Sequence, residues 1–187
     1  TNADRSILGF AIASTPPCRP SPAKRELTER CAMAAPAVYA AGLIEFPPRP
    51  GTLTNSGSGA LRRAAVAGID TFHLSSMNHS SGDSLDAAIC TALQRMRANV
   101  IFLAGYMKRL GPRTLAAFPA RILNTHPALL PKFGGHGMFG NRVFEAVLAA
   151  GESESGASVH LVDAAYDTGA VVRQERIPVL PGDTVES

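Results

Sequence analysis

The sequence has little of what would tie it to a metal, a disulfide framework or a membrane. Its 187 residues include three cysteines, Cys18, Cys31 and Cys90, which are widely spaced and form no CxxC pair. This pattern is typical of reduced thiols, so we expect neither disulfides nor a zinc site. No uninterrupted apolar run reaches the roughly 18 residues of a membrane-spanning helix, and the N-terminus lacks the layout of a signal peptide. A cytoplasmic protein is therefore expected.

Charge runs, metal-ligand spacings and serine-nucleophile motifs are also missing. The formal net charge is only +3, and there is no Lys/Arg run or basic–aromatic stripe of the kind that nucleic-acid binding requires. Histidine, cysteine and acidic residues do not recur at metal-ligand spacing, and the GxSxG motif of many serine hydrolases is absent. We expect a protein that binds small molecules as a monomer or weak homodimer, with no metal, nucleic acid or membrane as partner.

From Gly51 onward the sequence contains a regular alternation of strand and helix patterns. Strands are predicted at 52–59 (ending in a Gly/Ser turn), 69–76, 99–106, 121–124, 157–164 and 170–180, and helices at 60–68, from Asp83 or Ser84 onward, at 112–118 and at 140–152. Such alternation with short connections predicts a three-layer α/β fold, in which helices cover both faces of a mostly parallel sheet. The last two strands have no helix between them and are expected to form an antiparallel extension.

The first fifty residues have a different character. SILGFAIAS at 6–14 is compatible with a strand, but TPPCRPSPAKRE and EFPPRPG are rich in proline and typical of loops. A second irregular segment, NSGSG at 55–59, lies between a predicted strand and a predicted helix, where a loop can bind phosphate. It lacks the full dinucleotide fingerprint, however, and short Gly/Ser segments of this kind are commonly ordinary turns.

Two polar side chains interrupt the end of an apolar strand in RILNTHPALLPKFGG, residues 121–135. Asn124 and His126 are two positions apart, so they point to the same side if the chain is extended there. Pro127 favours that geometry because it pushes the preceding residue out of the helical region. Open parallel sheets bind ligands beyond the carboxyl ends of their strands, which is where this pair and the Tyr106–Lys108 segment fall.

The chemistry available to this pair is acyl transfer at a carbonyl carbon. Asn124 can donate a hydrogen bond to a developing oxyanion, while His126 can also move a proton. Asp167, in the turn AAYDTGA, is the best candidate to hold the imidazole, and His136 in a glycine-rich loop is a candidate substrate contact. The remaining histidines lie in strand or loop patterns and are predicted to be structural: His73, His79 and His160.

Four blocks, FLAGYMKRL, RILNTHPALLPKFGG, ESGASVHLVDAAYDTGAVV and IPVLPGDT, occur in this order within about residues 52–187. They resemble consecutive blocks of the phosphoribosylglycinamide formyltransferase family. The resemblance implies a formyltransferase-like, Rossmann-type fold, and transfer of a formyl group from 10-formyltetrahydrofolate to the amine of glycinamide ribonucleotide in de novo purine synthesis. Formyltetrahydrofolate hydrolases share the Asn-x-His core, so hydrolysis is an alternative. Another is a catalytically impaired homologue that binds folate and lacks the phosphate site.

The resemblance also implies roles for individual residues. Asn124 and His126 would bracket the transferred formyl group, and Asp167 would orient His126 and an ordered water. Gly105 and Pro127 would lie near the amine substrate. The residues implied to frame the folate, largely through backbone groups, are Tyr106, Met107, Lys108, Arg109, Leu110, Asp163, Ala164, Ala165 and Tyr166.

The sequence departs from the family at both ends. Family members begin with a strand and a glycine-rich phosphate loop, and they continue beyond the position of Ser187 into a helix that contacts the same substrate. Residues 1–50 are therefore expected to be a divergent, proline-rich segment that replaces the first strand and the loop, followed by a formyltransferase domain, 51–187, that is short at its C-terminus. Loss of a central strand would leave backbone groups and apolar surface unpaired, so low stability is expected.

Overall fold

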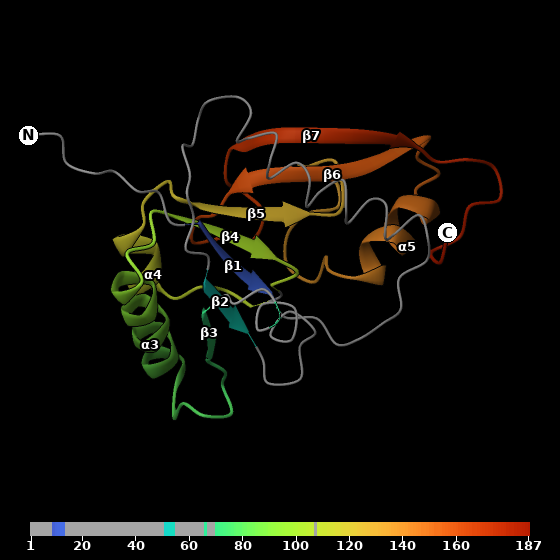
Figure 1. Ribbon diagram of the computed structural model, residues 1–187. Helices are drawn as coiled ribbons and strands as arrows, with labels where there is room; N and C mark the ends of the chain where they lie inside the picture. The colour runs from blue at the N-terminus through green and yellow to red at the C-terminus, as the bar shows by residue number, and fades with distance from the viewer. Residues whose placement is uncertain (1–8, 14–50, 55–65, 67–69, 107) are drawn as a thin grey trace, which may run out of the picture. The chain divides into compact units, whose positions relative to one another are not determined.

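The computed structural model, shown in Figure 1, describes residues 9–13, 51–54, 66, 70–106 and 108–187. The chain divides into two units: the first comprises Thr1–Cys18 and Val38–Leu123, and the second comprises Arg19–Ala37 and Asn124–Ser187. Of the predicted elements, the helix at 60–68 and the NSGSG turn fall outside the described residues, apart from Val66 in the helix. In the part of the chain that the structure describes, every helix is too short or too polar to cross a membrane.

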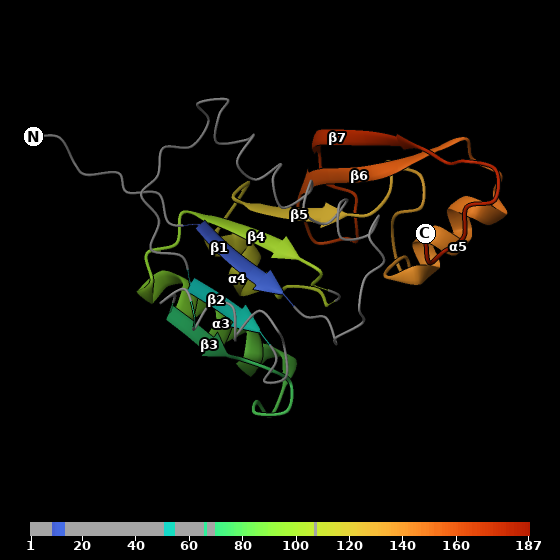
Figure 2. The same cartoon turned by 45° about the vertical axis from the view of Figure 1, so that its right-hand side comes forward.

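The first unit is built on parallel strands. These are β1 (Gly9–Ala13), β2 (Gly51–Thr54), β3 (Asp70–His73) and β4 (Val100–Ala104). Strand β1 pairs in parallel with β2 on one side and β4 on the other, and β2 pairs in parallel with β3 (Figures 1 and 2). The parallel arrangement predicted from the alternation of strands and helices is confirmed for this unit.

Strand β1 lies between β2 and β4, although residues 1–50 were expected to replace the first strand of the family. Phe10 lies beside Gly51 of β2 and Ile101 of β4, so the backbone of this strand is paired on both sides. The segment 6–14, whose sequence is compatible with a strand, contains β1, so the unpaired gap in the sheet that led us to expect low stability is not present at this position. Residues 14–50 lie outside the described residues, so the absence of a phosphate loop remains a prediction.

Helix α3 (Gly82–Arg95) begins within two residues of the predicted start. Ser81 caps it: the Ser84 amide donates to Ser81 Oγ at 3.1 Å, and the Ser81 amide donates to Ser84 Oγ at 3.3 Å. This reciprocal arrangement satisfies two backbone donors that the helix itself cannot. Ile89 and Leu93, four positions apart on one side of this helix, are buried.

A buried carboxylate on α3 caps the next helix, α4 (Pro112–Ala117). Asp86 is 4% exposed and accepts the backbone amides of Arg113 at 2.8 Å and Thr114 at 3.2 Å, together with the Thr114 hydroxyl. The N-cap residue of α4 is Gly111, which has no side chain to serve this purpose. A Cβ at Gly111 would lie 2.2 Å from Asp86 Cγ, so the close approach of the carboxylate requires glycine there.

Strand β5 (Ile122–His126) runs from the first unit into the second, which also contains α5 (Asn141–Ala149), β6 (Glu154–Leu161) and β7 (Val171–Pro178). Strands β6 and β7 pair antiparallel, which confirms the predicted C-terminal extension. Residues 155–160 of β6 are all buried, so both faces of this strand are covered. The α/β class predicted from the sequence is confirmed.

The loop after β5 is tied to the β6–β7 hairpin by a buried hydroxyl. Ser158, which has no exposed surface, donates from Oγ to the Ala128 carbonyl at 2.6 Å and accepts the Leu130 amide at 3.0 Å. Gln174 of β7 donates to Ser158 Oγ at 2.9 Å and to the Leu130 carbonyl at 2.8 Å. Four residues from three segments thereby fix the loop that follows Asn124 and His126.

Candidate functional site

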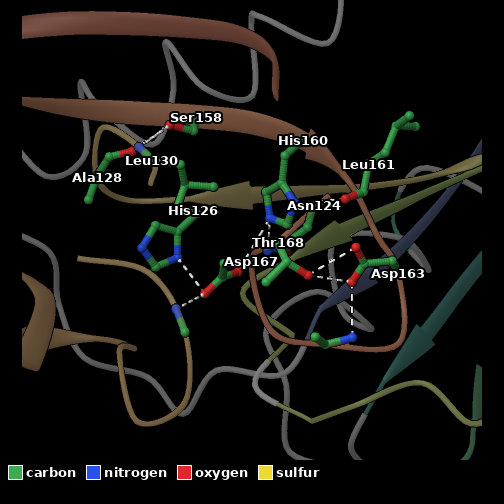
Figure 3. A network of polar contacts seen from close by, with 12 residues as sticks. Asn124, His126, Ala128, Leu130, Ser158, His160, Leu161, Asp163, Asp167 and Thr168 are labelled. Atoms are coloured by element: carbon green, nitrogen blue, oxygen red, sulfur yellow. Dashed lines mark hydrogen bonds and ion pairs between the residues drawn. The ribbon is translucent and has the colours of Figure 1, made fainter. Parts of the chain in front are cut away.

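His126, at the end of β5, has a specific partner for each ring nitrogen, and Figure 3 shows the contact with Asp167. Its side chain is 4% exposed. Nε2 donates to the carbonyl of Phe133 at 2.7 Å, and Nδ1 lies 3.5 Å from Asp167 Oδ2. Since a neutral imidazole carries one proton, the bond to Phe133 places that proton on Nε2 and leaves the lone pair of Nδ1 facing the carboxylate. A proton taken up by His126 therefore arrives at Nδ1.

Asp167 is held in place by its loop and by a backbone donor. Its backbone has φ of 56°, the left-handed region that is uncommon for a residue with a side chain. Asp163 stabilises the turn by accepting the Ala165 amide at 2.9 Å and the Thr168 hydroxyl at 2.8 Å. The Gly135 amide donates to Asp167 Oδ2 at 2.9 Å. The carboxylate is thus directed at the histidines from a constrained turn.

His160 of β6 lies in the same polar cluster, although the sequence pattern predicted a structural role for it. Its ring is buried, and Nδ1 donates to the Leu161 carbonyl at 2.8 Å. Nε2 accepts from Asn124 Nδ2 at 3.0 Å and lies 3.3 Å from Asp167 Oδ1. The signal that could have indicated this role is a titratable residue near the carboxyl end of a strand, three positions before Asp163.

Burial and charge act in opposite directions on the two titratable partners. Burial is the largest influence on His126 and lowers its pKa, although the negative charge of Asp167 and the Phe133 carbonyl partly offset this effect. Burial alone would raise the pKa of Asp167, but the polar contact with His160, the hydrogen bond from the Gly135 amide and the charge of His126 lower it below its usual value. The site therefore combines an ionised carboxylate with an imidazole that is neutral at physiological pH.

The structure brings Asn124, His126 and Asp167 into one cluster, as the sequence analysis expected. Tyr166, next to Asp167, packs edge-on against the exposed ring of His136, with centroids 5.8 Å apart. Both residues belong to loops that flank the cluster, so the stretch from Asp163 to Tyr166 and the glycine-rich loop meet beside the carboxylate.

The other segment singled out from the sequence lies at the carboxyl end of β4, in the first unit. Gly105 has φ of 65°, which suits glycine at a turn. Lys108 Nζ donates to Ser76 Oγ at 3.0 Å, and Leu110 is buried. Met107 falls outside the described residues.

The donor set of the cluster suits hydrogen bonding and proton transfer. Within the described residues, no group of three or more histidine, cysteine and acidic side chains is arranged to hold a metal ion. An amide donor, an imidazole and a carboxylate together can polarise a carbonyl, stabilise an oxyanion and relay a proton. This combination fits acyl transfer.

Comparison with known proteins places the chain in a family. Residues 52–187 match the family model described as formyl transferase. The chain belongs to the formyl transferase family.

Relatives with assigned names give a narrower indication. Over 125 residues the chain is 43% identical to a phosphoribosylglycinamide formyltransferase of Mycobacterium tuberculosis, an overlap that covers 66% of this chain and 55% of the relative. A phosphoribosylglycinamide formyltransferase of Haemophilus influenzae is 39% identical over 109 residues, covering 58% of this chain and 49% of the relative. The chain spans about half the length of these curated relatives.

Solved structures agree on the fold. Glycinamide ribonucleotide transformylase 1 from Symbiobacterium toebii superposes with a TM-score of 0.75 at 32% identity, covering 98% of this chain and 79% of that chain. A formyltetrahydrofolate deformylase from Pseudomonas syringae superposes with a TM-score of 0.71 at 19% identity, covering 98% and 55%. The similarity to the deformylase, at 19% identity, shows the fold alone. The similarity to the transformylase agrees with the names of the relatives.

Proposed function

We propose that the chain transfers a formyl group from 10-formyltetrahydrofolate to the amine of glycinamide ribonucleotide. The observation that carries the proposal is a cluster of three side chains. Asn124 and His126 lie at the end of β5, and Asp167 contacts His126 from the turn after β6. The names of the relatives point to phosphoribosylglycinamide as the formyl acceptor, and 10-formyltetrahydrofolate as the donor follows from the family resemblance. The proposal assigns the hydrogen-bond donation and the proton transfer to the amide, the imidazole and the carboxylate of this cluster, and it includes no metal.

Catalysis on this proposal begins when the substrate amine attacks the formyl carbon. A new C–N bond forms, and the carbonyl oxygen becomes an oxyanion in a tetrahedral intermediate. Asn124 Nδ2 donates a hydrogen bond to that oxyanion, and such donors act strongly where water is excluded. Collapse of the intermediate breaks the bond between the formyl carbon and N10 and releases tetrahydrofolate.

His126 moves the proton in this scheme. The attacking nitrogen becomes positively charged and must lose a proton, while N10 must gain one before it leaves. Nδ1 is the nitrogen that can take up a proton, because Nε2 is committed to the Phe133 carbonyl. Asp167, 3.5 Å from Nδ1, stabilises the imidazolium that forms and orients an ordered water for the relay.

The substrate-binding roles proposed for the remaining residues follow from family resemblance. Gly105 and Pro127 lie near the amine substrate, and the folate is framed by two short segments. These are Tyr106, Met107, Lys108, Arg109 and Leu110 after β4, and Asp163, Ala164, Ala165 and Tyr166 beside Asp167. The folate-binding role of the segment from Asp163 to Tyr166 is supported by its position directly before Asp167, which contacts His126.

The test is a transfer assay with purified chain, 10-formyltetrahydrofolate and glycinamide ribonucleotide, in which both products are quantified by chromatography. We expect formylated ribonucleotide and tetrahydrofolate in equal amounts, and no folate conversion when the ribonucleotide is omitted. Release of formate without the amine would instead establish a hydrolase. Calorimetric binding of a folate analogue without turnover would establish a folate-binding homologue, and either result would refute the proposal.

His126→Ala and Asn124→Ala serve as matched variants in this assay. Both should lose transfer. The thermal midpoint of Asn124→Ala should stay near that of the parent chain, whereas His126→Ala also removes the donor to the Phe133 carbonyl and should lower the midpoint without unfolding the chain. A variant that unfolds would show that the residue is needed for the core, and it would remove the support that the cluster gives to the proposal.

A further inference from the structure

His160 divides its two nitrogens between the backbone and the site. Nδ1 donates to the carbonyl of Leu161 at 2.8 Å, so the proton of a neutral His160 ring is placed on Nδ1. Nε2 then carries the lone pair and points into the cluster. The ring is 2% exposed, so bulk water does not replace these contacts.

Two groups with opposite requirements meet at Nε2 of His160. Asn124 Nδ2, a donor, lies 3.0 Å away, and Asp167 Oδ1, an acceptor, lies 3.3 Å away. A neutral Nε2 can accept from Asn124 but has no proton for Asp167. A protonated Nε2 can donate to Asp167 but can no longer accept from Asn124. The protonation of one nitrogen therefore decides which partner is held.

Asp167 connects this choice to His126. Its Oδ2 faces His126 Nδ1 at 3.5 Å, and its Oδ1 faces His160 Nε2. The two imidazoles thus flank a single carboxylate, which can neutralise one positive charge but not two. With the ring proton of His160 on Nδ1, its Nε2 holds the amide of Asn124, while Asp167 Oδ2 faces the nitrogen of His126 that takes up a proton.

We propose that His160 is a positioning residue of this site, which fixes the amide of Asn124 while His126 carries the proton. The inference rests on the proposed formyl transfer. The oxyanion donor Asn124 is thereby oriented by His160 Nε2, and the acid–base group His126 is contacted by Asp167. His160 touches neither the formyl group nor the amine in this scheme and acts through Asn124 and Asp167.

Two substitutions separate the functions of the two nitrogens. In His160→Asn the short amide lies near the former Nδ1 and can still donate to Leu161, but nothing reaches Asn124. In His160→Gln the longer amide reaches the former position of Nε2, where its oxygen can accept from Asn124. The two variants have similar polarity and differ mainly in the contact under test.

We expect kcat of His160→Asn to fall by about 10- to 100-fold, because misplacement of a catalytic group by about 1 Å can cost this much. The KM for folate should stay within about threefold. His160→Gln should keep kcat within about fivefold of the parent chain. Similar kcat values for the parent chain and folded His160→Asn, or equal losses in both variants, would overturn the inference.

A nuclear magnetic resonance measurement tests His160 independently of turnover. With ¹⁵N-labelled histidine, long-range ¹H–¹⁵N spectra of the parent chain should show His160 with its proton on Nδ1 and His126 with its proton on Nε2. The Asn124 side-chain amide signal should shift in His160→Asn and stay in place in His160→Gln. A proton on Nε2 of His160 would refute the positioning role. Absence of transfer by the parent chain with these spectra intact would refute only the proposed function.

Discussion

The loop that holds the Phe133 carbonyl against His126 should depend on the buried hydroxyl of Ser158. In Ser158→Ala the Ala128 carbonyl loses its donor, the Leu130 amide loses its acceptor, and Gln174 loses one of its two acceptors. A buried backbone group left unpaired costs roughly 1–3 kcal/mol. Ser158→Ala leaves two such groups, the Ala128 carbonyl and the Leu130 amide, and local adjustment relieves part of the cost. We therefore expect the free energy of unfolding to fall by about 2–4 kcal/mol.

Urea denaturation followed by circular dichroism measures this loss, with Gln174→Ala and the double variant completing a thermodynamic cycle. Because Ser158 and Gln174 share a hydrogen bond and the Leu130 backbone, the two substitutions should couple by at least about 0.5 kcal/mol. The turnover of folded Ser158→Ala should also fall, since the loop that carries Phe133 is no longer tied to β6. A loss of stability under about 0.5 kcal/mol, or strictly additive effects, would refute the reasoning.

Three further predictions concern single side chains. Asp86→Ala should lower the free energy of unfolding by about 2–4 kcal/mol, since two buried donors of Thr114 and the partly buried amide of Arg113 lose their acceptor. Asp86→Asn should cost less, and denaturant titration compares the two. Asp167→Asn should reduce kcat with little change in the thermal midpoint, because the amide cannot stabilise a protonated His126, and steady-state kinetics with calorimetry check both. The folded-state pKa of His126 lies below its ordinary value of 6.5, so the unfolded chain binds a proton more readily and stability should decline as the pH falls below about 6.5. Denaturation curves at pH 5 to 8 measure this decline, and His126→Gln should lack the part that His126 contributes.

Most of the secondary structure could be predicted because it follows from local patterns. The start of α3 follows from the capping serines, and the buried stripe of Ile89 and Leu93 follows from helical periodicity. Strand β1 was predicted as an apolar run, but its central position depends on pairing with residues 51–54 and 100–104, which no local pattern reports. The same limit applies to Asp86, whose partners lie 27 and 28 residues away.

The site was predictable in part. The proximity of Asn124 and His126 could be predicted because strand alternation and Pro127 fix their direction within a few residues. The position of His160 in the same cluster could not, because a single histidine in an apolar strand looks like an ordinary core residue, and its contact with Asn124 spans 36 positions. Sequence spacing reports such a contact only when the pairing of the strands is already known.

The groups that decide where the protons lie are backbone atoms. Carbonyls of Phe133 and Leu161 fix the tautomers of the two histidines, and the Gly135 amide orients Asp167. Phe133 has φ of 55° and Gly135 has φ of 96°, so the loop directs these groups through an uncommon backbone conformation. Since Ser158 and Gln174 anchor the preceding part of that loop, a substitution there should alter proton transfer without changing any residue of the Asn-x-His motif.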